Sequence, residues 1–117
     1  MEGLGALSDE DLVARYEDAA TKHGAATVSG SHPANEEANL IAAIYRELRS
    51  RGSEAALLRL LRSEDESVRG WAAAHALEFA PAQAEEVLVV LAEQPGLLGF
   101  DAQMTLREWR AGRLHFP

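Results

Sequence analysis

The chain has no cysteine, few aromatic residues and no long hydrophobic run. Because cysteine is absent from its 117 residues, disulfides, thiolate metal sites and a cysteine nucleophile are excluded. The longest apolar run, Val87 to Ala92, is far too short to span a membrane, and the acidic N-terminus lacks the basic and hydrophobic parts of a signal peptide. We therefore expect a cytoplasmic protein.

Basic residues are also scarce relative to acidic ones. The chain has 11 Lys and Arg against 19 Asp and Glu, which gives a formal net charge of -8. This charge opposes binding to nucleic-acid backbones and to anionic membranes, so neither is an expected partner. With only 6% aromatic residues and many Ala and Leu, the composition favours helices over strands. The sequence predicts an all-α fold in one domain, residues 1–117.

Hydrophobic periodicity and capping residues predict about six helices. Their approximate ranges are 9–22, 36–49, 53–62, 66–79, 82–93 and 101–111. Residues 1–7 have little to pack and are expected to be frayed, while Gly, Ser and Pro make 24–35 the longest expected loop. Asp65 and Asp101 are the expected N-caps of the helices that follow them. Leu114 or Phe116 is expected to pack back on the domain.

The helix expected at 66–79 is rich in small side chains. At about 100° per residue, one arc carries four apolar positions and reads as a central packing layer. These positions are Val68, Ala72, Ala76 and Phe79. The last four expected helices follow each other as two short hairpins, and a hairpin that is apolar on both sides must stack on others to bury those sides.

The stretch Asp65-Glu-Ser-Val-Arg69-Gly-Trp-Ala-Ala-Ala-His-Ala-Leu77 resembles a HEAT-type repeat, with its turn acid, Val-Arg pair and Ala-rich helix. Nearly the whole chain also resembles a small bacterial family of uncharacterised HEAT-like proteins of ARM-type fold. Ile44–Gly52, Phe79-Ala80-Pro81 and Met104-Thr105-Leu106-Arg107 contribute to this second resemblance. The resemblance implies a stack of antiparallel helix hairpins, in which Asp65 and Arg69 make structural hydrogen bonds.

The sequence offers no catalytic or metal-binding pattern. Its histidines, at positions 23, 32, 75 and 115, include no pair at helical ligand spacing. The acidic clusters fall in expected first helical turns, where the helix dipole favours carboxylates. Phosphate-binding loops and nucleophile elbows are also missing. We therefore expect a protein that is not an enzyme and that has no cofactor or metal.

Two surface features allow either a functional or a structural interpretation. The arginines concentrated between Arg46 and Arg69, together with Arg107, Arg110 and Arg113, form a basic groove for an acidic partner or, as we favour, pair with glutamates on solvated faces. Trp71 and His75 form an interface hot spot, with Trp109 nearby, or pack against a neighbouring helix, which we again favour. The candidate interaction residues are Trp71, His75, Arg69, Arg107, Trp109 and Arg110.

The repeat pattern and the missing catalytic groups favour a module that binds another protein. Such a module neutralises or regulates its partner, for example as an immunity-type protein neutralises a toxin. One alternative is a small-molecule-binding or enzymatic helical domain with Trp71, His75 and Arg69 around a pocket. Another is a structural protein that forms a homodimer through an exposed apolar arc.

Overall fold

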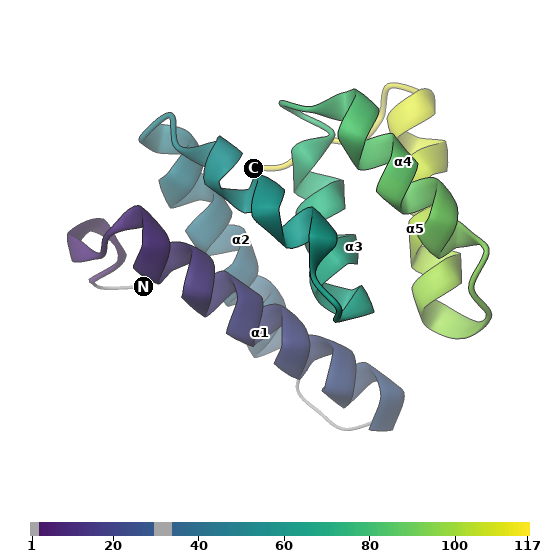
Figure 1. Ribbon diagram of the computed structural model, residues 1–117, viewed down its shortest axis with the longest axis horizontal. Helices are drawn as coiled ribbons and strands as arrows, with labels where there is room; N and C mark the ends of the chain where they lie inside the picture. Colours follow the sequence, from purple (N-terminus) through teal and green to yellow (C-terminus); the bar gives the residue numbers. More distant parts are fainter. Residues whose placement is uncertain (1–2, 30–33) are drawn as a thin grey trace. The chain divides into compact units, whose positions relative to one another are not determined.

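The computed structural model describes residues 3–29 and 34–117, and all regular structure in these ranges is helical. The expected all-α fold class is confirmed (Figure 1). The elements are the 3-10 helices η1 (Leu4–Ala6) and η2 (Glu54–Arg62) and the α-helices α1 (Asp9–Ser29), α2 (Ala34–Ser50), α3 (Glu66–Ala76), α4 (Pro81–Ala92) and α5 (Gly96–Arg110). The chain divides after Leu57 into two compact units, which we describe separately, and the single domain stays a prediction.

The first unit is built on α1 and α2, which pack against each other and run in opposite directions (Figure 1). Ser8 Oγ accepts a hydrogen bond from the Asp11 N–H at 3.1 Å and so caps the start of α1. The large buried side chains of this unit follow helical spacing on both helices. They are Leu12, Val13, Tyr16, Ile41, Ile44, Tyr45 and Leu48.

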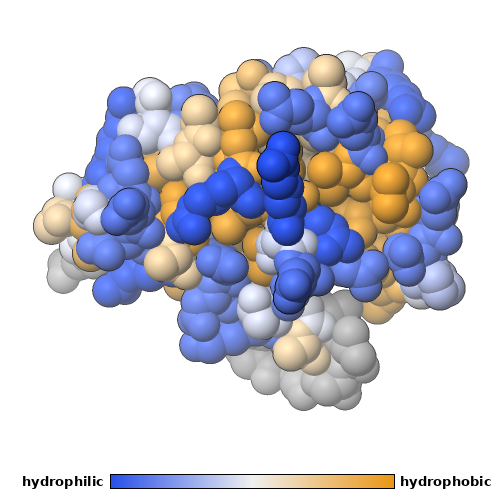
Figure 2. Space-filling view, in the orientation of Figure 1, coloured by the Kyte–Doolittle hydropathy of each residue, from blue (hydrophilic) through white to orange (hydrophobic). Residues whose placement is uncertain are grey.

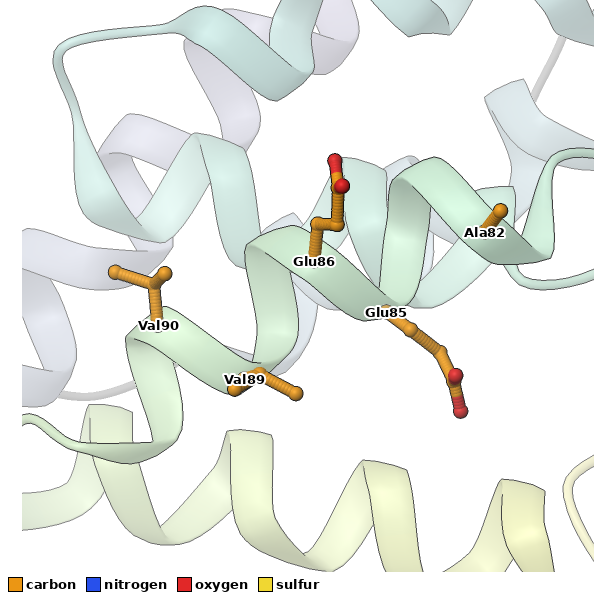
Figure 3. A pocket seen from close by; sticks show the side chains of 5 residues that line it. All are labelled: Ala82, Glu85, Glu86, Val89 and Val90. Carbon is orange, nitrogen blue, oxygen red and sulfur yellow. The ribbon is translucent and has the colours of Figure 1, made fainter.

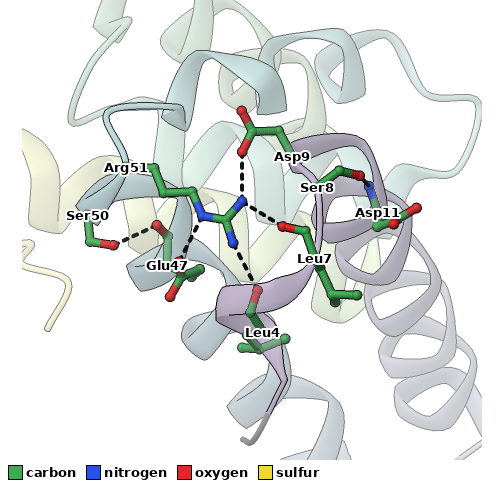
Figure 4. Close-up of polar contacts among 8 residues, drawn as sticks. All are labelled: Leu4, Leu7, Ser8, Asp9, Asp11, Glu47, Ser50 and Arg51. Atoms are coloured by element: carbon green, nitrogen blue, oxygen red, sulfur yellow. Dashed lines mark hydrogen bonds and ion pairs between the residues drawn. The ribbon is translucent and has the colours of Figure 1, made fainter.

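The N-terminal segment of this unit is fixed, and the expected fraying is wrong for residues 3–7; residues 1 and 2 lie outside the described part. Leu4 is buried, and the Arg51 guanidinium donates to the carbonyl oxygens of Leu4 and Leu7 at 2.9 and 2.7 Å (Figure 4). Arg51 also donates to Asp9 at 3.1 Å and to Glu47 at 2.8 Å. The side chain of Arg51, which directly follows α2, therefore holds the segment from Leu4 to Leu7 in place.

The loop expected at 24–35 is largely helical in the described residues. α1 continues through Gly24 to Ser29, and α2 begins at Ala34, while 30–33 lie outside the described residues. The expected first helix, 9–22, ends before Gly24, whereas α1 runs through this glycine. A glycine inside a helix costs only about 1 kcal/mol relative to alanine. This penalty is small for α1, because the helix packs along α2.

The second unit contains α3, α4 and α5, and each of these helices packs against the other two. α4 and α5 run in opposite directions (Figure 1), as expected for a hairpin. Val68, Ala72 and Ala76 are fully buried, which confirms the central packing layer. Phe79 is only half-buried because α3 ends at Ala76, short of the expected end.

The last helix begins earlier than expected. α5 starts at Gly96, so Leu97 to Phe100 is helix rather than a connection, and Asp101 lies inside the helix instead of capping it. Gly96 has a φ of 80°, a left-handed turn that suits glycine and starts the helix directly after Pro95. A Cβ on Gly99 would lie 1.7 Å from the Gln94 carbonyl oxygen, so the first turn of α5 requires glycine at this position as well.

Candidate functional site

Asp65 and Arg69 fix the turn that leads into α3. Asp65 Oδ1 accepts hydrogen bonds from the N–H groups of Ser67 and Val68 at 2.8 and 3.2 Å, which confirms Asp65 as the N-cap. Arg69 Nη1 donates to the Ser63 carbonyl oxygen at 2.6 Å, and its Nη2 lies 3.7 Å from Glu66. Both residues make the structural hydrogen bonds that the resemblance implied. Arg69 is thus committed to the turn.

His75 lies inside the second unit with only 2% of its surface exposed, so it does not contribute to the outer surface. Its ring makes an edge contact with Phe116, with centroids 4.6 Å apart, and lies 6.2 Å from the Trp71 ring. Phe116 therefore packs back on the helices, as expected for the tail. Trp71 is half-buried, and its packing supports the structural interpretation of this pair.

The other three candidate residues lie on the C-terminal half of α5. Arg107 and Arg110 are exposed, and Arg110 Nε lies 3.5 Å from Glu85 Oε1 on α4. Trp109 is half-buried on α5, which packs against the helix that carries Trp71. The proximity of the two indoles stays a prediction.

Part of the pairing that we favoured for the arginines in the middle of the sequence is present. Two of the expected pairs are present, Glu47 with Arg51 at 2.8 Å and Glu66 with Arg69 at 3.7 Å. Arg49 places its guanidinium 5.2 Å from the Tyr45 ring centroid, a cation–π contact. These arginines are used within their own units, and this weakens the hypothesis of a basic groove.

The sequence reading missed the exposed apolar residues between positions 89 and 100. Among the described residues, the large hydrophobic side chains that are well exposed are Val89 (44%), Val90 (57%), Leu97 (59%) and Phe100 (55%). The Val-rich run of α4 is almost continuously apolar in the sequence. Helical spacing separates it into Leu88 and Leu91, which are buried, and the two valines, which face outward. This spacing was a usable signal in the sequence.

A shallow open hollow of about 650 Å³ lies on α4 and is lined by Ala82, Glu85, Glu86, Val89 and Val90. We call these five residues the α4 surface. Figure 3 shows Glu86 and Val90 on one side of the ribbon and Glu85 and Val89 on the side of α5. In Figure 2, a hydrophobic area bordered by hydrophilic residues lies where Figure 1 places α4. The α4 surface is apolar in its middle and acidic at its side.

Groups suited to metal binding are not found in the described ranges 3–29 and 34–117, where no three His, Asp or Glu side chains converge. In the same ranges, none of the helices has both the length and the hydrophobicity that a membrane crossing requires.

Comparison with known proteins identifies a similar fold. No family model matches the chain, and no curated protein matches it. The crystal structure of the protein RPA1889 from Rhodopseudomonas palustris CGA009 is similar, with 26% sequence identity, a TM-score of 0.91 and coverage of 98% of each chain. Two chains with this TM-score share one fold over nearly their whole length.

Proposed function

We propose that this chain is a non-enzymatic, HEAT-like cytoplasmic module that binds another protein through the second unit. The α4 surface and the exposed start of α5 form the binding region, and binding neutralises or regulates the partner, as in an immunity-type role. The observation that carries this proposal is the clustering of exposed apolar side chains within residues 89–100. Contiguous exposed apolar residues beside polar ones are typical of protein interaction sites.

The alternative of a ligand pocket around Trp71, His75 and Arg69 has less support. The His75 ring is buried between two aromatic side chains, and the Arg69 guanidinium is bonded to the turn before α3. Neither group is available to a small molecule unless the packing of α3 changes. Of the six residues first considered as an interaction surface, Arg107 and Arg110 are exposed, and Arg110 pairs with Glu85 of the α4 surface.

Site-specific photo-cross-linking in the native host tests the proposed function. A photoreactive phenylalanine analogue replaces Val90 or Phe100, both more than half exposed, and the covalent products are identified by mass spectrometry. We expect the same partner protein from both positions. The matched control places the analogue at Ala14, which is exposed on α1 in the first unit.

A partner captured from Val90 and Phe100 and absent from the Ala14 sample supports the proposal. Cross-links that are identical at all three positions, or that are missing at Val90 and Phe100 under every growth condition, overturn it. The substitutions Val90→Asp and Ala14→Asp provide a second readout. Loss of the partner is expected only with Val90→Asp, because the aspartate places a charge in the apolar part of the α4 surface.

A further inference from the structure

The exposed face of α4 has a regular arrangement of charge. Glu86, Val89, Val90 and Glu93 are all exposed, and positions three, four and seven apart lie on one side of a helix. At a rise of about 1.5 Å per residue, the seven-residue interval puts the two carboxylates about 10 Å apart along the axis. Along the helix axis, two exposed valines therefore lie between two exposed acids, with Val89 on the side of α5 and Val90 on the other side of this face (Figure 3).

The charged groups on this face are all negative. Glu85 pairs with Arg110 at its edge, whereas in the described ranges neither Glu86 nor Glu93 forms an ion pair. The chain as a whole carries a net charge of -8, which adds to the negative potential at the surface. An occupant with cations at both ends and an apolar middle is complementary to this pattern.

We propose that the occupant is an amphipathic helix of the partner protein that carries two Lys or Arg residues seven positions apart, with apolar residues between them on the same face. This inference rests on the proposed function. A helix fits because its seven-residue spacing returns to the same face after about 10 Å. A strand does not fit, because residues on one of its faces recur at about 6.6 and 13 Å.

A second copy of this chain does not supply such a helix. In the described helices, cations seven positions apart on one helix occur in α1, at Arg15 and Lys22. Asp18 lies between them and forms an ion pair with Lys22 at 3.0 Å, and Asp11 lies on the same side. This face of α1 has no apolar middle and its cations are offset by acids of its own, so it does not match the pattern of Glu86, the two valines and Glu93.

Peptide titration tests the inference on the purified full chain. The probe is a synthetic Ala-rich helical peptide with lysines seven positions apart and leucines three and four positions after the first lysine. The first control peptide has glutamates in place of both lysines. The second control keeps both lysines but spaces them five apart, so that they lie on different faces. Binding is followed by chemical-shift changes of the backbone amides.

We expect the first peptide to bind, with shifts concentrated at residues 82–93, the glutamate peptide to bind at least tenfold more weakly, and the peptide with lysines five apart to bind about two- to fivefold more weakly, the effect of one lost exposed ion pair. Glu86→Gln with Glu93→Gln is expected to weaken binding about two- to thirtyfold, the range of two exposed ion pairs. Glu10→Gln removes an exposed acid from α1 and is expected to leave binding unchanged. Raising the salt concentration is expected to remove the advantage of the lysine peptide.

Equal binding of the glutamate peptide, shifts outside α4, or an unaffected Glu86→Gln/Glu93→Gln variant overturns the inference. Sedimentation that shows a dimer dissociated by Val90→Asp also overturns it, since the occupant is then a second copy. These results are distinct from a failure of the proposed function. If Val90 cross-links to a partner whose contact site has no basic helix, the function stands and the helix inference fails.

Discussion

Arg51 donates a hydrogen bond from Nη2 to the backbone carbonyl oxygen of Leu4 at 2.9 Å, across 47 positions of the sequence. The same guanidinium reaches a second carbonyl, that of Leu7, and the carboxylates of Asp9 and Glu47. The hydrogen bond with Glu47 is the main cause that raises the pKa of Arg51, so the group stays charged at all ordinary pH values. The contact joins η1 to the end of α2.

Arg51→Ala is expected to release the N-terminal segment. The amides of Ala6 and Leu7, which now donate within the segment to the carbonyls of Gly3 and Leu4, should exchange with solvent faster. Hydrogen exchange read by mass spectrometry measures this. Arg51→Lys is expected to restore little of the protection from exchange, because one ammonium group does not match acceptors that are arranged around a planar guanidinium. Unchanged exchange at residues 4–7 would contradict the prediction, and the exposed Arg46→Ala on α2 serves as the control.

Two glycines of the second unit are expected to respond in opposite ways to alanine. At Gly70 a Cβ meets Leu91 and Leu98 at ordinary distances of 3.7 and 3.9 Å, so Gly70→Ala should stabilise α3 by about 0.5 to 1 kcal/mol. At Gly99 the Cβ would overlap the Gln94 carbonyl, so Gly99→Ala should destabilise the unit by about 1 to 3 kcal/mol. Urea unfolding measures both, and a shift in the same direction for the two variants would refute the packing described here.

Ala76→Asp is expected to unfold the second unit. Ala76 is fully buried, and an unpaired carboxylate there costs about 3 to 5 kcal/mol, comparable with the whole stability of a small domain. Ala82→Asp makes the same change at an exposed position near the start of α4, where the helix dipole favours a negative charge. Circular dichroism during thermal unfolding should separate the two. A cooperatively folded Ala76→Asp protein of normal stability would show that the core is assigned wrongly.

Stability is expected to fall above about pH 10 because of Tyr16. Burial, and secondarily Tyr45, raises the pKa of Tyr16 well above the ordinary tyrosine value of about 10. At higher pH the unfolded chain loses this proton while the folded chain keeps it. The free energy of unfolding should therefore fall by up to about 1.4 kcal/mol per pH unit, with no effect below about pH 9.

Denaturant unfolding of the wild type at pH values from 8 to 11.5 measures this slope. Tyr16→Phe removes the titrating group and keeps the ring, so its stability should depend less on pH in the alkaline range. The same alkaline slope in both proteins would show that another group is responsible.

The sequence predicted most helices because their signals are local. Asp65 caps α3 through its own neighbours, and the spacing of Val68, Ala72 and Ala76 follows from the helical repeat. The end of α1 was placed too early because Gly24 resembles a helix stop, and the start of α5 was placed too late because Asp101 resembles an N-cap, although Gly99 lies inside the helix. Gly24 is tolerated inside a packed helix, while Gly99 is required by the nearby Gln94 carbonyl oxygen.

Local sequence signals were also insufficient to predict which of the candidate interaction residues are exposed. Arg107 and Arg110 were correctly placed on an exposed helix end, but His75, on the less apolar arc of its helix, is buried against Phe116. Val89 and Val90 belong to the apolar run Val87 to Ala92, in which the sequence does not mark the exposed positions. Their exposure follows from which side of α4 packs against α3 and α5.

By itself, the sequence determined the all-α class, the acidic charge and the cap at Asp65, since composition and interactions within one turn decide these properties. Tertiary structure alone decided that Arg51 holds Leu4, that His75 is enclosed and that the valines of α4 face outward. Each of these outcomes depends on contacts between residues distant in the sequence or on the packing of one helix on another. A periodic pattern identifies the faces of a helix, but only its neighbours determine which face remains exposed.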